Sequence, residues 1–322
     1  MNPLVSIIVV NWNGIKYIKE CLDSLSNLSY SNYEIILVDN ASSDGSVELV
    51  EKNYPTVKLI RNKENLGFAE GNNIGIKETK GDLIALFNPD AIAEKEWLSS
   101  LVSVLQSSET IGAVAGKIYY YGDKFGKNAV FCTWSKVDPH SASPYNFHKN
   151  EPVSKVDYLS GAAMVVKRTV IDKIGFLDPN YFLYFDETDW CARMIRAGYD
   201  LVYVPTAIAW HVVSASVDNL LKKTYYMERS RIRFALKNFD TSYIPVFVFI
   251  FLSESFFIFF RDVRNRNFAR TKVRARAILW NLSNLGFTLK RRNSDMYILK
   301  KNCQVRSYNK SLPLRELKVG SH

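Results

Sequence analysis

The chain has 322 residues, enough for two average domains or one large one. Hydrophobic residues make up 47% and charged residues 23%, which excludes global disorder and is typical of a globular protein with a substantial core. The formal net charge of +10 favours a polyanionic partner such as nucleic acid, an anionic membrane or a phosphate-bearing ligand.

The charge is unevenly distributed along the chain. Residues 1–221 carry 20 basic and 26 acidic side chains, whereas residues 222–322 carry 22 basic and 6 acidic side chains, a net of +16. The four cysteines are far apart and show no CxxC spacing, which argues against a disulfide framework and a structural zinc site. We therefore expect a reducing, cytoplasmic compartment, with the basic excess confined to the last third of the chain.

Strand and helix patterns alternate over the first 120 residues. Continuous apolar runs predict buried strands at 6–10 and 34–38, and two further strands are predicted at 57–60 and 82–87. Helical spacing predicts helices over 15–25, up to about residue 53, and over about 68–79. This order predicts an α/β fold, a Rossmann-like and mostly parallel sheet with flanking helices, whose ligands bind at the carboxyl ends of the strands.

Later segments are less regular. Residues 117–155 predict loops and short strands that could cover a site, and a strand pattern over 158–166 precedes a helix near 169–174. A boundary near residue 215 divides the chain into a domain at 1–215 and a helical, basic region at 216–322. That region holds a predicted helix at 220–239 and an apolar run at 244–260.

Two nucleotide-binding motifs are missing. The turn after the first strand reads Asn11-Trp12-Asn13-Gly14, and a single glycine does not make the glycine-rich turn of a dinucleotide site. There is also no GxxxxGK[ST] loop. These absences argue against a nicotinamide-dependent dehydrogenase and a P-loop enzyme.

Carboxylates follow two of the predicted strands. Asp39 could be a helix cap or turn residue, or it could accept hydrogen bonds from a nucleotide base or ribose. Asp90 could likewise be a turn residue, or it could hold a divalent cation that bridges phosphate oxygens.

Three carboxylates also occur within four residues, at Asp186, Glu187 and Asp189. They follow an aromatic run and precede Trp190, and apolar neighbours raise the pKa of a carboxyl group toward that of a general base. A charged surface helix is the alternative. His211 ends a strand-like segment, and its value as a ligand depends on whether Asp90 lies close by.

These segments, in this order, resemble the family 2 glycosyltransferases, in the branch with rhamnosyl- and galactofuranosyltransferases. The resemblance covers about residues 4–235. It rests on residues 5–13, 38–46, 65–75, 88–90, 160–163 and 185–193, followed by His211. The segment 65–75, NLGFAEGNNIG, is highly specific for this branch.

The resemblance implies a GT-A fold and an inverting, metal-dependent transfer of a sugar from a nucleotide-sugar, dTDP-rhamnose or a UDP-sugar, to a hydroxyl of a glycan or lipid-linked acceptor. It implies a Mg²⁺ or Mn²⁺ ion held by Asp90 and His211. The implied donor-binding residues are Val9, Asn11, Asn13, Asp39, Asn65, Gly67, Asn72 and Asn88. The implied acceptor-binding residues are Gly161, Ala162 and Trp190.

Two positions depart from the family pattern. The family usually reads Glu-Asp where this chain reads Asp186-Glu187, so Glu187 takes the position of the catalytic base, with Asp186 and Asp189 as alternatives. Asn88 stands at the first position of the DxD motif, which removes one anionic ligand.

The apolar run at 244–260 allows three interpretations: an interfacial helix, a core helix of the protein or of an oligomer, or a membrane-spanning helix. Glu254 within the run disfavours spanning, and the basic residues that follow suit anionic lipid. We expect residues 240–292 to meet an anionic membrane surface, with the protein peripheral on the cytoplasmic face of the cell membrane. A polyprenyl-linked acceptor suits this placement, and the oligomeric state stays open.

A rival interpretation is a basic protein that binds nucleic acid or membranes and carries a non-catalytic nucleotide-sugar-binding domain. The aromatic residues of the basic region lie in an apolar run rather than interleaved with lysines, so we do not expect nucleic acid as a partner.

Overall fold

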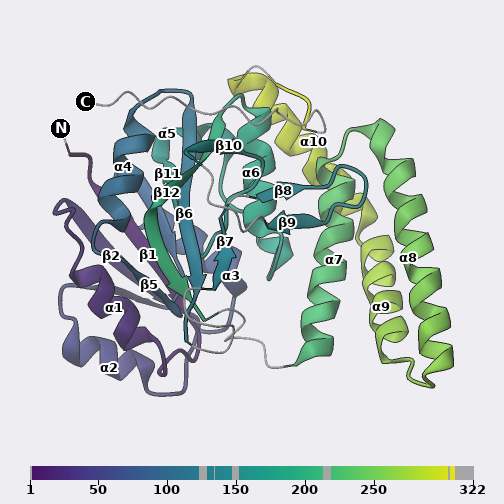
Figure 1. Cartoon of the computed structure of the whole chain (residues 1–322), viewed down its shortest axis with the longest axis horizontal. Coiled ribbons are helices and arrows are strands. Elements are labelled where there is room, and N and C mark those ends of the chain that lie inside the picture. Colours follow the sequence, from purple (N-terminus) through teal and green to yellow (C-terminus); the bar gives the residue numbers. More distant parts are fainter. Residues whose placement is uncertain are drawn as a thin grey trace.

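The computed structural model describes residues 2–122, 129–133, 135–146, 152–212, 219–303 and 305–308. The described part forms one large mixed sheet with helices on both faces, and a group of long helices beside it (Figure 1). The strands are β1 (Val5–Asn11), β2 (Tyr33–Asp39), β3 (Lys58–Arg61), β4 (Leu83–Phe87), β5 (Ala91–Ala93), β6 (Ile111–Tyr120), β7 (Val130–Cys132), β8 (Ser135–Val137), β9 (Pro144–Asn146), β10 (Ser154–Val156), β11 (Ala163–Lys167) and β12 (Asp200–His211). The helices are α1 (Ile18–Ser26), α2 (Ser46–Asn53), α3 (Gly67–Lys77), α4 (Trp97–Gln106), α5 (Arg168–Ile174), α6 (Asp186–Arg196), α7 (Leu220–Asn238), α8 (Ile244–Arg264), α9 (Ala269–Ser283) and α10 (Leu285–Asn302), with short 3₁₀ turns at Pro179–Tyr181 and Thr241–Tyr243.

The strand order is β10-β12-β6-β11-β4-β1-β2-β3. β1 pairs in parallel with β2 and β4, and β2 pairs in parallel with β3. These are the four strands predicted from the sequence, and their pairing confirms the α/β fold class. The other half of the sheet is mixed, because β11 runs antiparallel to both β4 and β6.

Both faces of the sheet are covered, which explains the continuous apolar runs. Along β1, Ile7 and Val9 face a core shared with α1 and α4, whereas Ile8 and Val10 face a second core shared with α3. All four side chains are at most 9% exposed. A strand buried on both faces cannot show the alternation of polar and apolar residues that marks a half-exposed strand.

Two central elements were not predicted. Patterns in the sequence gave no helix at α4, and they assigned the region from residue 117 to loops and short strands. β6 instead extends through residue 120 and lies between β11 and β12. Its pairing with two strands distant in sequence, rather than its local pattern, decides its length.

The helical region packs directly on the sheet domain. The predicted boundary at residue 215 lies outside the described residues. Lys237 Nζ of α7 lies 2.9 Å from carboxylate oxygens of Asp178, Asp189 and Asp295, and Arg233 Nη2 lies 2.9 Å from Asp178. Asp178 and Asp189 belong to the sheet domain and Asp295 to α10, so one buried ionic network joins the two parts.

Helix α8 is long and apolar enough to cross a membrane. The stretch Thr241–Arg264 contains an 18-residue window with mean hydropathy 2.1, of which 11% is buried. Its packed side carries Glu254, which accepts hydrogen bonds from both Arg231 terminal nitrogens at 2.9 and 3.0 Å and from Arg274 at 3.3 Å. α8 is therefore held by charges to α7 and α9. It lies at the outer edge of the helical group (Figure 1), and much of its apolar surface is exposed.

Candidate active site

Three predicted side chains meet at the carboxyl end of the sheet. Asn88 and Asp90 follow β4, and His211 ends β12, where it pairs with Ala91 of β5. His211 Nε2 lies 3.0 Å from Asp90 Oδ1 and 3.0 Å from Asn88 Nδ2. The condition set by the sequence, that His211 must lie close to Asp90, is met.

This cluster has unused hydrogen-bonding capacity. Asn88 Oδ1 and His211 Nδ1 are buried without a hydrogen-bond partner among the described residues. Carboxylate, amide and imidazole ligands suit Mg²⁺ or Mn²⁺, so the residues fit the predicted cation. Across the described ranges no group of three His, Cys, Asp or Glu side chains could hold a metal, so phosphate oxygens or water must supply the remaining ligands.

Asp39 and Asn11 lie side by side at the ends of β2 and β1, where they are paired in the sheet register. Asp39 Oδ1 accepts a hydrogen bond from Asn11 Nδ2 at 2.9 Å, and Asp39 Oδ2 accepts one from the Ser42 backbone N–H at 2.9 Å. Both side chains are nearly fully buried. Asp39 therefore fixes the turn after β2, which was the structural alternative, and its predicted contact with the donor stays a prediction.

Asn13 and Val9 occupy different settings around β1. Asn13 has a left-handed backbone with φ of 50°, and it exchanges hydrogen bonds with the turn at Ser42 and Ser43. Val9 is fully buried inside the strand ladder, between Leu37 and Phe87. The Val9 side chain thus belongs to the core, and only Asn13 of this pair lies at the sheet edge.

The segment NLGFAEGNNIG forms the turn into α3 and the first part of that helix. Asn65 Oδ1 accepts a hydrogen bond from the Gly67 backbone N–H at 2.9 Å. Gly67 has φ of +78°, and a Cβ there would lie 2.6 Å from the carbonyl oxygen of Phe182, so only glycine fits. Asn72 is buried and donates to the Phe68 carbonyl at 2.9 Å, whereas Asn65 Oδ1 also accepts a hydrogen bond from Asn40 Nδ2 at 3.4 Å, so Asn65 links this turn to the end of β2.

Asn73 is a positioning residue that the predicted site omitted, although it lies in the quoted motif. Its amide accepts from the Leu177 backbone N–H and donates to the Leu177 carbonyl, both at 3.0 Å. These two hydrogen bonds tie α3 to the segment that leads into α6. The two adjacent asparagines of the motif, Asn72 and Asn73, were the signal in the sequence that could have identified this residue.

The segment before α6 has an unusual backbone. Phe182, Tyr184 and Phe185 adopt positive φ values of 62°, 63° and 67°, a region that bulky residues rarely occupy. Such conformations persist where the surrounding structure holds them, and they cluster at functional sites. Here they deliver Asp186 and Glu187 into the first turn of α6.

Glu187 is held by two neighbours from the segment before β11. The Tyr158 hydroxyl donates to Glu187 Oε1 at 2.9 Å. Burial and the nearby Glu187 carboxylate raise the pKa of Tyr158, so its hydroxyl remains a donor. A Cβ on Gly161 would lie 3.2 Å from Glu187 Cβ and 3.3 Å from Cγ, so the backbone at Gly161 lies directly against Glu187.

Asp186 is chemically different from Glu187. It is 2% exposed, and its Oδ2 has no hydrogen-bond partner among the described residues. Burial raises the pKa of Asp186 well above its usual range, and the neighbouring Glu187 carboxylate raises it further. Both causes favour the neutral form of Asp186, which makes it a weaker candidate for the base than Glu187.

Asp189 and Trp190 face the interior rather than the sheet edge. Asp189 is fully buried and bonded to Arg193, Lys237 and Asn238 at 3.0, 2.9 and 2.7 Å. Trp190 is fully buried, and its Nε1 donates to the Gly175 carbonyl at 2.9 Å. The structure gives both a packing role, because their polar atoms are already occupied, and neither is positioned to contact an acceptor.

Two consecutive residues connect the halves of the site. Gly161 lies against Glu187, and the Ala162 carbonyl accepts a hydrogen bond from the Asn88 backbone N–H at 2.9 Å. The segment before β11 thus lies against the Glu187 side chain at Gly161 and against the Asn88 backbone at Ala162. Glu187 and the Asn88–Asp90–His211 cluster therefore contact consecutive residues of one short segment.

Two known proteins are similar to this chain in sequence. The chain is 27% identical over 227 residues to the uncharacterized protein y4gI of Sinorhizobium fredii, an alignment that covers 66% of this chain and only 25% of that protein. It is 25% identical over 236 residues to an N-acetylglucosaminyl-diphospho-decaprenol L-rhamnosyltransferase of Mycobacterium tuberculosis, covering 66% of this chain and 76% of that protein.

A solved structure shares the fold. The mannosyltransferase PcManGT of Pyrobaculum calidifontis, solved in complex with GDP-Man and Mn²⁺, is similar with a TM-score of 0.57 and 16% identity, over 93% of this chain and 85% of that one. This likeness supports the GT-A fold expected from the sequence. The sequence model of Glycosyl transferase family 2 matches residues 6–175, more than half of the 322 residues, so the chain belongs to Glycosyl transferase family 2.

Proposed function

We propose that this protein is an inverting glycosyltransferase that moves a sugar from a nucleotide-sugar to the hydroxyl of a glycan or lipid-linked acceptor. One observation carries the proposal: Gly161 lies against the Glu187 side chain, and the next residue, Ala162, accepts a hydrogen bond from the backbone of Asn88 in the Asn88–Asp90–His211 cluster. Direct displacement at an anomeric carbon needs a base on one side and an anion-binding site for the leaving diphosphate on the other.

Glu187 is the proposed base. It would take the proton of the acceptor hydroxyl while that oxygen attacks the anomeric carbon and the bond to the diphosphate breaks. Because attack and departure lie on opposite faces of the sugar, the anomeric configuration inverts. The bond from Tyr158 holds the Glu187 carboxylate in one orientation, so the base is preorganised before the acceptor arrives.

Asp90 and His211, whose Oδ1 and Nε2 lie 3.0 Å apart, would hold a Mg²⁺ or Mn²⁺ ion, with Asn88 Oδ1, which is buried without a partner among the described residues, as a third contact. When bound, the ion would neutralise charge on the leaving diphosphate. Asn11, Asn13, Asp39, Asn65, Gly67 and Asn72 remain the proposed donor-binding residues. We propose dTDP-rhamnose or a UDP-sugar as the donor, and the rhamnosyltransferase relative supports the first.

We further propose that the acceptor is polyprenyl-linked and that residues 240–292 lie on the cytoplasmic face of the membrane. Phe249 and Phe257 of α8 are each 72% exposed, so α8 presents a large apolar surface. A spanning arrangement would require Glu254 to leave Arg231 and Arg274 or to carry them into the bilayer, which is costly. These contacts favour an interfacial helix.

The decisive experiment is the substitution Glu187→Gln. Glutamine can still accept the Tyr158 hydrogen bond but cannot take a proton, so we expect turnover to fall by about 10²–10⁴-fold while the donor still binds. Donor binding is measured by calorimetry with Mn²⁺, and transfer by release of the nucleoside diphosphate. Near-normal transfer by Glu187→Gln would rule out the proposed base.

Asp90→Asn tests the proposed metal site separately. We expect it to weaken Mn²⁺-dependent binding of the donor at least about tenfold, because it replaces an anionic ligand by a neutral one. Asp44→Asn, a carboxylate in the turn before α2, is the matched control. Equal effects of the two substitutions would contradict the assignment.

A further inference from the structure

A second pocket lies at the end of the helical region where α7 and α9 begin. It encloses about 880 Å³, within the usual range for ligand sites. Its lining residues are Asn219, Leu221, Lys222, Tyr225, Tyr226, Arg266, Asn267, Phe268, Ala269, Lys272, Val273 and Arg276. Four of them are basic and none is acidic, which makes the pocket attractive to an anion.

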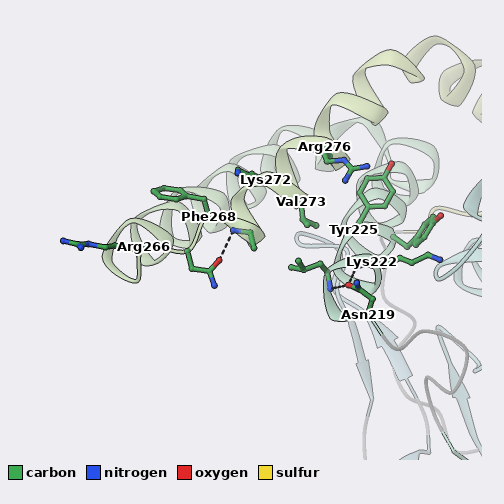
Figure 2. Close-up of a pocket in the computed structure, with 12 residues that line it drawn as sticks. Asn219, Lys222, Tyr225, Arg266, Phe268, Lys272, Val273 and Arg276 are labelled. Carbon is green, nitrogen blue, oxygen red and sulfur yellow. Dashed lines mark hydrogen bonds between the residues drawn. The ribbon is translucent and has the colours of Figure 1, made fainter.

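The basic side chains come from three segments. Lys222 lies in the first turn of α7, Lys272 and Arg276 lie one helical turn apart on α9, and Arg266 lies in the connection between α8 and α9. Figure 2 shows Arg276 beside Tyr225, and Arg266 reaching outward at the far end. None of the four forms an ion pair with a carboxylate in the described part of the chain, so their charge is available to a ligand.

The pocket is also partly apolar. Leu221 and Phe268 in its lining are each 41% exposed. Phe268 follows the end of α8, whose surface near that end carries Phe260 at 54% and Val263 at 44% exposure. The basic side chains of the pocket therefore adjoin exposed apolar surface. This arrangement suits an amphiphile with a charged head and a hydrocarbon tail.

One wall of the pocket touches the segment that presents the proposed base. Tyr226 stacks on Phe182 with ring centroids 5.3 Å apart, and the Arg229 guanidinium lies 4.9 Å above the Tyr226 ring. Arg229 also donates to the carbonyls of Asn180 and Tyr181. The Phe182 carbonyl in turn accepts from the Phe68 backbone N–H at the start of α3, so the pocket contacts, through Tyr226, the segment that leads into α6.

We propose that this basic pocket binds the phosphate or diphosphate headgroup of a lipid, whose hydrocarbon chain lies along the exposed face of α8. The inference rests on the proposed lipid-linked acceptor and membrane attachment. The headgroup comes either from the acceptor lipid itself, which would place the acceptor beside Glu187, or from an anionic membrane phospholipid. Both sources present the same chemistry to Lys222, Lys272 and Arg276.

The test is flotation of the full chain with vesicles of phosphatidylcholine, with and without a minor share of phosphatidylglycerol. Lys272→Gln with Arg276→Gln should weaken binding to the anionic vesicles by about 25-fold, at about fivefold for each cation removed from the surface. Lys300→Gln with Lys301→Gln, two exposed lysines of α10 outside the pocket, removes the same charge as a control. Equal losses in the two double variants would overturn the pocket assignment, because only the total charge would then matter.

Two further measurements separate the possible ligands. Inorganic pyrophosphate should compete with anionic vesicles for the wild-type chain. A higher KM for a lipid-linked acceptor in the pocket variant, at unchanged donor binding, identifies the acceptor lipid as the source of the headgroup. An unchanged KM with weakened vesicle binding identifies the membrane phospholipid. If the pocket variant loses binding to a single-stranded oligonucleotide but keeps vesicle binding, the proposal is wrong. If the wild-type chain does not bind the nucleotide-sugar donor, the proposed glycosyltransferase function is contradicted instead.

Discussion

Replacing Lys237 by methionine tests the ionic network that joins the helical region to the sheet domain. Lys237 is 1% exposed, and its ammonium lies 2.9 Å from carboxylates of Asp178, Asp189 and Asp295. Methionine keeps an unbranched apolar chain of similar length but removes the charge. Two of the three carboxylates belong to the sheet domain, and Asp189 sits in the helix that presents Glu187.

The expected loss of stability is large. Removing one partner of a buried ion pair costs about 3–5 kcal/mol, because the remaining charge stays buried without compensation. Arg193 and Arg233 still neutralise part of the excess, through contacts of 3.0 Å to Asp189 and 2.9 Å to Asp178. We therefore expect about 3 kcal/mol, a substantial part of the roughly 5–15 kcal/mol that stabilises an average domain.

The pH dependence gives an independent check. Burial opposes ionisation of Asp178 and Asp189, but the nearby cations and side-chain hydrogen bonds together outweigh burial and hold the pKa of both carboxyl groups below the usual range. Lys237 is the largest of these opposing causes at both carboxyl groups. A lowered pKa in the folded state stabilises the protein above the unfolded-state pKa, and this contribution is lost as the pH falls through the folded-state value. The deficit of Lys237→Met should thus be greatest near neutral pH and should shrink in acid.

The assay is urea-induced unfolding followed by circular dichroism, with Lys290→Met as the matched control. Lys290 is exposed on α10 and makes no ion pair with a described carboxylate, so its replacement should change the unfolding free energy by less than about 0.5 kcal/mol. A loss below about 1 kcal/mol for Lys237→Met would refute the view that this network joins the two parts.

Two further predictions concern Asp157 and Gly161. Burial raises the pKa of Asp157 to about 6, so its ionisation destabilises the fold as the pH rises from about 4 to about 6. Asp157→Asn should therefore be about 1–3 kcal/mol more stable than the wild type at about pH 7.5 and nearly equal to it at about pH 3.5; a gain of the same size at both pH values would contradict this cause. Gly161→Ala places a methyl group 3.2 Å from Glu187 Cβ, and the carboxylate must shift. Turnover should fall by about tenfold or more with little change in melting temperature, whereas Gly286→Ala, which meets nothing within 4 Å, should leave turnover unchanged.

The sequence predicted the local elements best where burial dictates residue type. The strands β1, β2 and β4 were recognised because both of their faces are covered, which leaves runs of aliphatic residues, whereas β3 is a partly exposed strand at the edge of the sheet. The same logic failed for β6, whose partners β11 and β12 lie 50 to 90 residues further along the chain. Its boundaries depend on pairing that no local window contains.

Among the site residues, motif order identified Glu187, Asp90 and His211, and local chemistry could not rank the neighbours. Asp186, Glu187 and Asp189 are all carboxylates within one helical turn of each other. The helix turns each to a different environment: Asp186 to a buried position that favours its neutral form, Glu187 to Tyr158, and Asp189 to Lys237. Trp190 resembled an acceptor contact in sequence, but it is directed inward to Gly175.

The sequence by itself determined the family, the alternating α/β pattern and the separation of charge, because each is written in residue order and composition. Only the tertiary structure decided which polar residues are near one another. Asp90 meets His211 across β5 and β12, Lys237 reaches Asp189 across two helices, and Arg231 and Arg274 pair with Glu254. These distances depend on how the elements pack, and packing is a property of the whole chain rather than of any one segment.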